Sequence, residues 1–146
     1  MTKPSTMEML IDLATTEVDK AAVRLGHSIR FADEAEQKLV LLSQYREDYS
    51  ARFQENRASG LTAMDYRNFQ HFLDKLDQAI VGQQQLVRDA QKRIDEDRSL
   101  WQASERKRAS FNTLATRAQK TIQKKENKIE QKQMDEFASR NSRFRQ

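Results

Sequence analysis

The sequence predicts an all-α fold in which two long helices form an antiparallel coiled-coil hairpin. Helix breakers are scarce, since the 146 residues include three glycines and one proline. The composition, 37% hydrophobic and 33% charged, is too polar for a compact core, yet the chain lacks the breakers of a disordered linker. Apolar residues also recur every 3.5 positions on average, which gives a narrow seam suited to one or two partner helices.

The first helix is expected from about residue 5 to residue 57. Pro4 lies at a plausible helix start, and Gly26 falls inside a strongly periodic segment, where it costs about 1 kcal/mol relative to alanine without ending the helix. Two interleaved sets of residues, each spaced by seven, form the seam. They are Ile11, Val18, Leu25, Ala32, Leu39, Arg46 and Phe53, and Ala14, Ala21, Ser28, Ala35, Leu42 and Tyr49.

A turn over about residues 58–62 separates this helix from a second one, expected over about 63–140. Ser59 and Gly60 supply the turn, and Thr62 with Asp65 three residues later is a fair N-cap. One seam set of this helix is almost entirely apolar or aromatic: Tyr66, Leu73, Ile80, Val87, Ile94, Trp101, Arg108, Ala115, Ile122 and Ile129. Its companion set is mixed, because Gln83, Asp97 and Ser104 interrupt it.

Folding the second helix back about Gly60 pairs residues whose numbers sum to about 118 or 119, if the seams face each other. The expected layers include Phe53 with Tyr66, Tyr49 with Phe69, Leu42 with Leu76, and Leu25 with Ile94. On this register residue 4 pairs near residue 115, so the second helix extends about 25 residues further. Its apolar residues there, Ile122, Ile129, Met134 and Phe137, then need another protein to cover them.

The charge distribution is uneven along the chain. Residues 1–104 carry 14 Lys or Arg and 17 Asp or Glu, whereas residues 105–146 carry 12 and 5, a net charge of +7. Such a segment attracts an acidic protein surface, nucleic acid or anionic lipid, without choosing among them. The absence of aromatic residues between 112 and 136 argues against nucleic acid, and a solvated helix face is the plain alternative. The candidate contacts are Arg117, Lys120, Lys124, Lys128, Met134 and Phe137.

Catalytic and metal sites are not expected. The chain has no cysteine, and its two histidines, His27 and His71, are far apart in sequence, so thiol chemistry and a histidine metal centre have no basis. A two-helix hairpin offers no enclosed pocket for acid–base chemistry. We therefore expect a protein that is not an enzyme and uses no cofactor. The N-terminus lacks a signal-peptide core and no apolar run could span a membrane, so a soluble cytosolic protein is expected.

One apolar cluster is expected at the margin of the hairpin near its turn. It comprises Leu42, Tyr45, Tyr49, Phe72, Leu76 and Ala79. Aromatic residues in such a place can simply cover the core of the coil, or they can form a surface for a partner protein. The residues by themselves leave both interpretations open.

Four segments together resemble the FliJ family of flagellar export proteins across nearly the whole chain. They are LIDLATTEVDKAAVRLG (Leu10–Gly26), LLSQYREDY (Leu41–Tyr49), NFQHFLDKLDQAI (Asn68–Ile80) and QKQMDEFA (Gln131–Ala138). Heptads alone produce false likeness between coiled coils, but the last segment is not a heptad pattern. It is therefore the most specific part of the resemblance.

The resemblance implies a component of the bacterial flagellar type III export apparatus, with a coil similar to the central stalk of rotary ATPases. Such a protein binds the hexameric export ATPase and promotes its assembly and activity. It also contacts the cytoplasmic region of the export-gate membrane protein and helps to recycle substrate chaperones. It would act in the cytoplasm, peripherally at the inner membrane and through these partners alone.

The family's gate-binding face, carried over to this chain, would use the six residues of the apolar cluster. Lys38 and Gln83 stand where the better-known pattern has glutamine and histidine. The basic last third, with Met134 and Phe137, would contact the ATPase or a chaperone. Two other functions remain open: a nucleic-acid-associated basic helical protein, and a structural coiled-coil tether that associates with itself.

Overall fold

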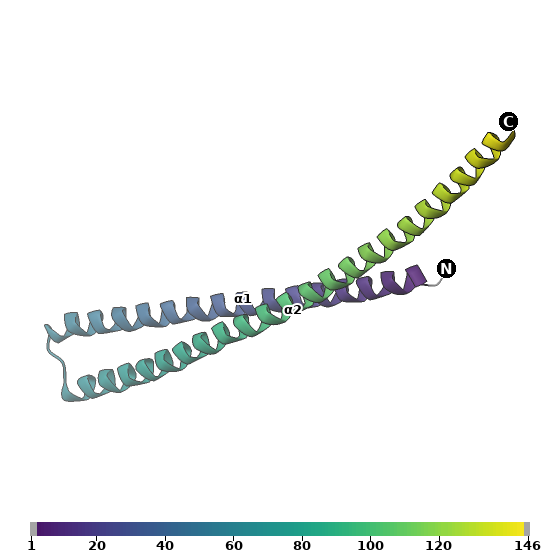
Figure 1. Ribbon diagram of the computed structural model, residues 1–146. Coiled ribbons are helices and arrows are strands. Elements are labelled where there is room, and N and C mark those ends of the chain that lie inside the picture. Colours follow the sequence, from purple (N-terminus) through teal and green to yellow (C-terminus); the bar gives the residue numbers. More distant parts are fainter. Residues whose placement is uncertain (1–2, 145–146) are drawn as a thin grey trace. The chain divides into compact units, whose positions relative to one another are not determined.

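The computed structural model describes residues 3–144, and within them the chain consists of two helices joined by one turn (Figure 1). Helix α1 spans Lys3–Arg57, 55 residues, and helix α2 spans Ala63–Phe144, 82 residues. No strand occurs in this part of the chain. The all-α hairpin fold is confirmed, and α2 continues four residues beyond the expected end near residue 140.

The turn has the chemistry that its sequence predicts. Gly60 adopts a φ of 87°, in the left-handed region that glycine enters without a steric cost. Thr62 Oγ1 accepts a hydrogen bond from the Asp65 amide at 3.2 Å, and the Asp65 carboxylate accepts one from the Thr62 amide at 3.4 Å. This reciprocal capping box satisfies two amides at the start of α2, and the expected N-cap is confirmed.

The chain divides into two compact units. The first, called the hairpin unit, comprises Asp19–Gln102 and contains the turn. Its buried residues on α1 are small, namely Ser28, Ala32 and Ala35, while those on α2 are mostly larger, namely Phe69, Leu76, Ala90, Ile94 and Asp97. Small side chains on one helix let the other approach closely, which gives the dense packing of a two-helix interface.

The end of the hairpin unit beside the turn is packed with aromatic rings. Phe53 stacks on Phe69 with ring centroids 3.5 Å apart and lies 5.7 Å from Tyr66. Tyr49 stacks on Phe69 at 5.0 Å. Two of the expected layers, Phe53 with Tyr66 and Tyr49 with Phe69, are thereby confirmed. Further along, Leu25 packs against the buried cluster of Ala32, Ala90 and Ile94, as the layer of Leu25 with Ile94 predicts.

Polar residues on the seam find partners on the opposite helix. The Gln83 side-chain amide donates a hydrogen bond to the Ala35 carbonyl oxygen at 2.9 Å. The Ser28 hydroxyl donates to the Asp97 carboxylate, and both residues are buried. Two of the three interruptions in the seam of α2, Gln83 and Asp97, are therefore hydrogen-bonded positions that tie one helix to the other.

The second unit, called the terminal unit, combines the start of α1 up to Val18 with α2 from Ala103 onward. Ala14 and Val18 are buried, and Lys107 Nζ lies 3.4 Å from Glu17 Oε2. A groove of about 430 Å³ is lined from α1 by Met7, Glu8 and Ile11 and from α2 by Ala115, Ala118, Gln119 and Ile122. Pairing in this unit thus reaches Ile122, about one helical turn or two beyond the expected limit near residue 115.

From residue 116 to residue 144, every residue of α2 is exposed. The expectation of an extended, exposed end of α2 that starts near residue 115 is confirmed, although Ala118, Gln119 and Ile122 still line the groove beside α1. Within the described residues, neither helix has a stretch long and apolar enough to cross a membrane.

Candidate functional site

The first candidate surface is the cluster of Leu42, Tyr45, Tyr49, Phe72, Leu76 and Ala79, here called the aromatic patch. The structure brings its three rings together within the hairpin unit. Tyr49 and Phe72 have centroids 4.6 Å apart, Tyr45 meets Phe72 edge-on at 6.2 Å, and Tyr45 lies 6.4 Å from Tyr49. Aromatic pairs in these arrangements add stabilisation beyond the area that they bury.

Members of the aromatic patch differ in how much of them a partner could reach. Tyr45 is 50% exposed and Ala79 is also exposed, whereas Leu42, Tyr49 and Phe72 are half-buried. Leu76 is 8% exposed and belongs to the core of the hairpin. A partner could therefore reach Tyr45 and Ala79 directly. The other residues of the patch lie deeper, toward the core of the hairpin.

Lys38 and Gln83, which the resemblance places at the edge of this surface, also differ in exposure. Lys38 is exposed, while Gln83 is half-buried and its amide is engaged by the Ala35 carbonyl. Because Lys38 is exposed, its side chain adds a positive charge at the edge of the surface that a partner would contact. Gln83 serves the contact between the two helices.

An ion pair lies next in sequence to two residues of the patch. Arg46 donates hydrogen bonds to both carboxylate oxygens of Asp77, and both side chains are partly exposed. The hydrogen bond from Arg46 and the positive charge of its guanidinium hold the pKa of Asp77 below its ordinary value, although desolvation opposes this shift. The same contact raises the pKa of Arg46. Arg46, the charged residue in the seam of α1, is accommodated by reaching this carboxylate.

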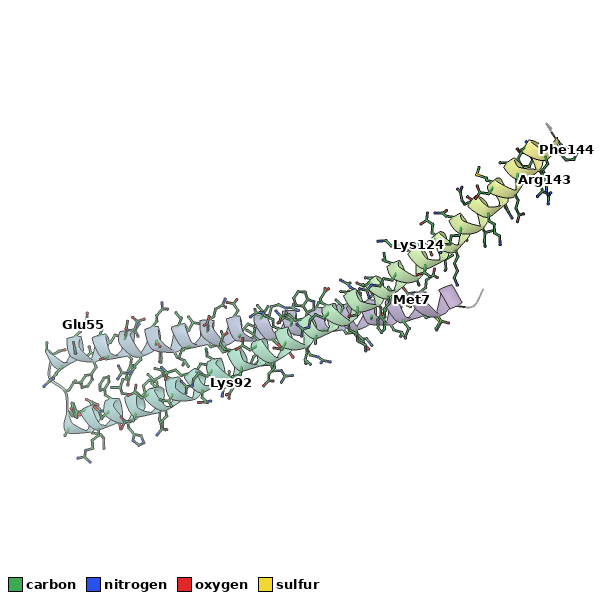
Figure 2. The ribbon with its side chains drawn as sticks, in the orientation of Figure 1. Met7, Glu55, Lys92, Lys124, Arg143 and Phe144 are labelled. Atoms are coloured by element: carbon green, nitrogen blue, oxygen red, sulfur yellow. The ribbon has the colours of Figure 1, made fainter. Side chains whose placement is uncertain are left out.

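The second candidate surface is the exposed end of α2. Arg117, Lys120, Lys124 and Lys128 are all exposed, and Figure 2 shows Lys124 projecting from the helix. Large apolar residues of the same segment are also exposed: Ile122 at 50%, Ile129 at 57%, Met134 at 69% and Phe137 at 67%. Exposed apolar side chains grouped along a helix are a common feature of surfaces that bind other proteins.

Met134 and Phe137 share a shallow depression with Glu130 and Gln133, about 500 Å³ in volume. All four residues come from α2 alone. The sequence correctly placed the two apolar residues together, at a spacing of three along one helix face. The depression can receive an apolar side chain from another protein.

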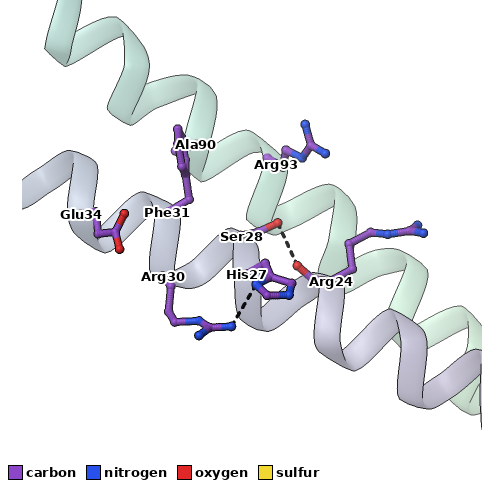
Figure 3. A pocket seen from close by; sticks show the side chains of 8 residues that line it. All are labelled: Arg24, His27, Ser28, Arg30, Phe31, Glu34, Ala90 and Arg93. Atoms are coloured by element: carbon purple, nitrogen blue, oxygen red, sulfur yellow. Dashed lines mark hydrogen bonds between the residues drawn. The ribbon is translucent and has the colours of Figure 1, made fainter.

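A third feature, an open groove, was not among the sites that the sequence predicted, since only an enclosed pocket for acid–base chemistry was considered there. A groove of about 650 Å³ in the hairpin unit, called the basic groove, has Ser28 and Ala90 among its lining (Figure 3). Its remaining lining side chains are Arg24, His27, Arg30, Phe31, Glu34 and Arg93. The signal in the sequence was the recurrence of Arg24, His27, Phe31 and Glu34 at three- and four-residue steps along one face of α1.

In the described part of the chain, no three His, Cys, Asp or Glu side chains are grouped closely enough to hold a metal ion. The three surfaces offer aromatic, aliphatic and positively charged side chains. Such groups suit recognition of another protein.

Comparison with known proteins places these features in a family context. The family model described as flagellar FliJ protein matches residues 2–146. The flagellar FliJ protein of Escherichia coli strain K12 is 30% identical over 140 residues, which cover 96% of this chain and 95% of the relative. The flagellar FliJ protein of Salmonella typhi matches with the same identity and coverage.

Proposed function

Because the chain belongs to the FliJ family of flagellar proteins, we propose that it is a non-enzymatic component of the flagellar type III export apparatus. It binds the hexameric export ATPase and promotes its assembly and activity. It also links the ATPase to the cytoplasmic region of the export-gate membrane protein and helps to recycle substrate chaperones. Its place of action is the cytoplasmic face of the inner membrane, reached through these partners.

The observation that carries this proposal is the uncovered face of α2 beyond Ile122. Ile129, Met134 and Phe137 are each more than half exposed, and burying the exposed part of each side chain would contribute roughly 1–2 kcal/mol. The surrounding segment, residues 105–146, carries a net charge of +7. A partner with an apolar strip bordered by acidic residues complements both properties, and we assign this role to the ATPase or to a chaperone.

The aromatic patch is the proposed contact for the export gate. Tyr45 presents a large ring that is 50% exposed, and tyrosine is enriched among the residues that dominate binding energies. The rings of Tyr49 and Phe72 pack against the ring of Tyr45, with centroid distances of 6.4 and 6.2 Å. Leu76 contributes by packing in the core of the hairpin, and Ala79 leaves room for a partner side chain.

The experiment for the gate contact compares two tyrosines of the hairpin unit that are equally exposed. Tyr45 is 50% exposed and Tyr66 is 51% exposed, and each packs against aromatic neighbours. With the purified cytoplasmic region of the gate protein, Tyr45→Ala should weaken binding about tenfold, the loss of one anchor residue. Tyr66→Ala should change it less than about twofold. Equal affinities for the two variants would remove the patch from the proposal.

A further inference from the structure

The basic groove holds three arginine side chains whose charge is not neutralised by ion pairs. Arg24, Arg30 and Arg93 take part in none of the ion pairs formed among the described residues. Arg30 Nη2 lies 2.9 Å from His27 Nδ1, as Figure 3 shows. Because a guanidinium is a donor, the imidazole nitrogen is the acceptor in this contact.

The arginines belong to two helices. Arg24 and Arg30 lie on α1 and Arg93 lies on α2, and all three line the same groove. Each is exposed and therefore available to a ligand. Guanidinium groups bind carboxylates in a bidentate manner, so three of them around one groove favour a ligand with several carboxylates.

An aromatic ring lies among these charges. Phe31 is 53% exposed and lines the groove together with Arg24 and Arg93. Its hydrocarbon surface suits an apolar side chain of a ligand rather than a purely polar one. The ligand that fits this groove is thus both acidic and apolar.

From these contacts we infer that the basic groove binds a short acidic peptide segment of a partner protein, one in which an apolar side chain lies between glutamates or aspartates. The carboxylates pair with Arg24, Arg30 and Arg93, and the apolar side chain packs on Phe31. This site goes beyond the proposed function, because it uses neither the aromatic patch nor the exposed end of α2.

The surrounding charges favour a short acidic segment over a long polyanion. The hairpin unit, residues 19–102, carries 13 Lys or Arg and 14 Asp or Glu, a net charge of −1. Glu34 also lies in the groove itself. The groove covers residues 24–34 of α1, about 15 Å of helix, so a nucleic acid strand would extend from it onto neutral or negative surface and be repelled.

The test measures fluorescence anisotropy of the full chain with a labelled peptide of about ten residues that alternates glutamate and phenylalanine. Arg24→Gln with Arg93→Gln should weaken binding at least about tenfold, through the loss of two charge-assisted contacts. The control, Arg67→Gln with Lys75→Gln, removes the same charge from exposed positions elsewhere in the hairpin unit. It should change the affinity less than about twofold, since screened, distant charges contribute little.

Further measurements separate the contributions of the aromatic ring and of the charges. Phe31→Ala should weaken binding about threefold while leaving the charge unchanged, and a peptide with glutamine in place of glutamate should not bind. Equal losses for the groove and control variants would overturn the inference, as would absence of binding to the unaltered chain. Displacement of the peptide by a single-stranded oligonucleotide of equal charge at a lower concentration would also overturn it. Circular dichroism of each variant checks that helix content is retained.

Discussion

Ser28 on α1 donates a hydrogen bond to Asp97 on α2, and the two residues are 8% and 6% exposed at the seam of the hairpin unit. A buried carboxylate is costly unless hydrogen bonds compensate its lost hydration. Ser28 Oγ is also 3.2 Å from the Arg24 carbonyl oxygen, so the single hydroxyl proton has two acceptors. The pair therefore ties the helices together at one register while contributing little net stability.

The two partners should respond oppositely to replacement. Ser28→Ala leaves the Asp97 carboxylate buried without its partner and should destabilise the fold by about 1–3 kcal/mol. Asp97→Leu removes the buried charge next to Ile94, while Ser28 keeps the Arg24 carbonyl as acceptor, so it should stabilise the fold by about 1 kcal/mol. Urea unfolding monitored by circular dichroism measures both changes. Destabilisation by Asp97→Leu of similar size would mean that the hydrogen bond outweighs the cost of burying the carboxylate.

The ion pair of Arg46 and Asp77 predicts a small pH dependence of stability. The pKa of Asp77 is lowered in the folded chain from its ordinary value of 3.8, so the folded state binds this proton less readily than the unfolded state. The stabilisation is complete above the unfolded pKa and is lost as the pH falls through the lower, folded pKa. The effect should be modest because both side chains are well exposed to solvent.

Asp77→Asn provides the comparison for this pH dependence. The difference in urea midpoint between the unaltered chain and Asp77→Asn should be constant between about pH 5 and pH 7 and should shrink below about pH 4. Measuring both proteins across this range cancels the contributions of the other carboxyl groups. A difference that stays constant down to about pH 2 would show that the carboxylate is not stabilised by Arg46.

Burial separates the members of the aromatic patch in a way that stability measurements can check. Leu76→Ala removes a side chain that is 8% exposed and should destabilise the fold by about 2–3 kcal/mol, because it leaves a cavity in the core. Tyr45→Ala removes a ring that is 50% exposed and should cost about 1 kcal/mol or less. Thermal unfolding of the two variants provides the comparison. Similar losses would place Tyr45 in the core beside Leu76.

Much of the fold follows from the sequence because local rules determine it. Gly60, Thr62 and Asp65 specify the turn and the start of α2 through backbone freedom and capping. The apolar seam then specifies which faces meet, so that the layers of Phe53 with Tyr66 and of Tyr49 with Phe69 were predictable. The burial of α2 ends at Ala115, as the register predicts, but the register did not show that Ile11 and Ile122 line one groove, because a small change of register accumulates over many turns.

The candidate surfaces were likewise predicted in part from the sequence. Heptad positions placed Tyr45 and Phe72 at one level of the hairpin and Leu76 in the seam, but did not reveal how far Tyr45 and Ala79 are exposed. Exposure depends on the rotation of each helix about its own axis, which a repeat of seven residues specifies only approximately. The basic groove was not foreseen because Arg93 joins Arg24 and Arg30 only through contacts between residues far apart in sequence.

The proposed action of this chain on the flagellar export ATPase can be measured as steady-state ATP hydrolysis by the purified ATPase, titrated with the full chain. We expect a saturable increase in hydrolysis, accompanied by formation of ATPase rings in size-exclusion chromatography. Unchanged hydrolysis and an unchanged elution profile at a several-fold molar excess of the chain would contradict it.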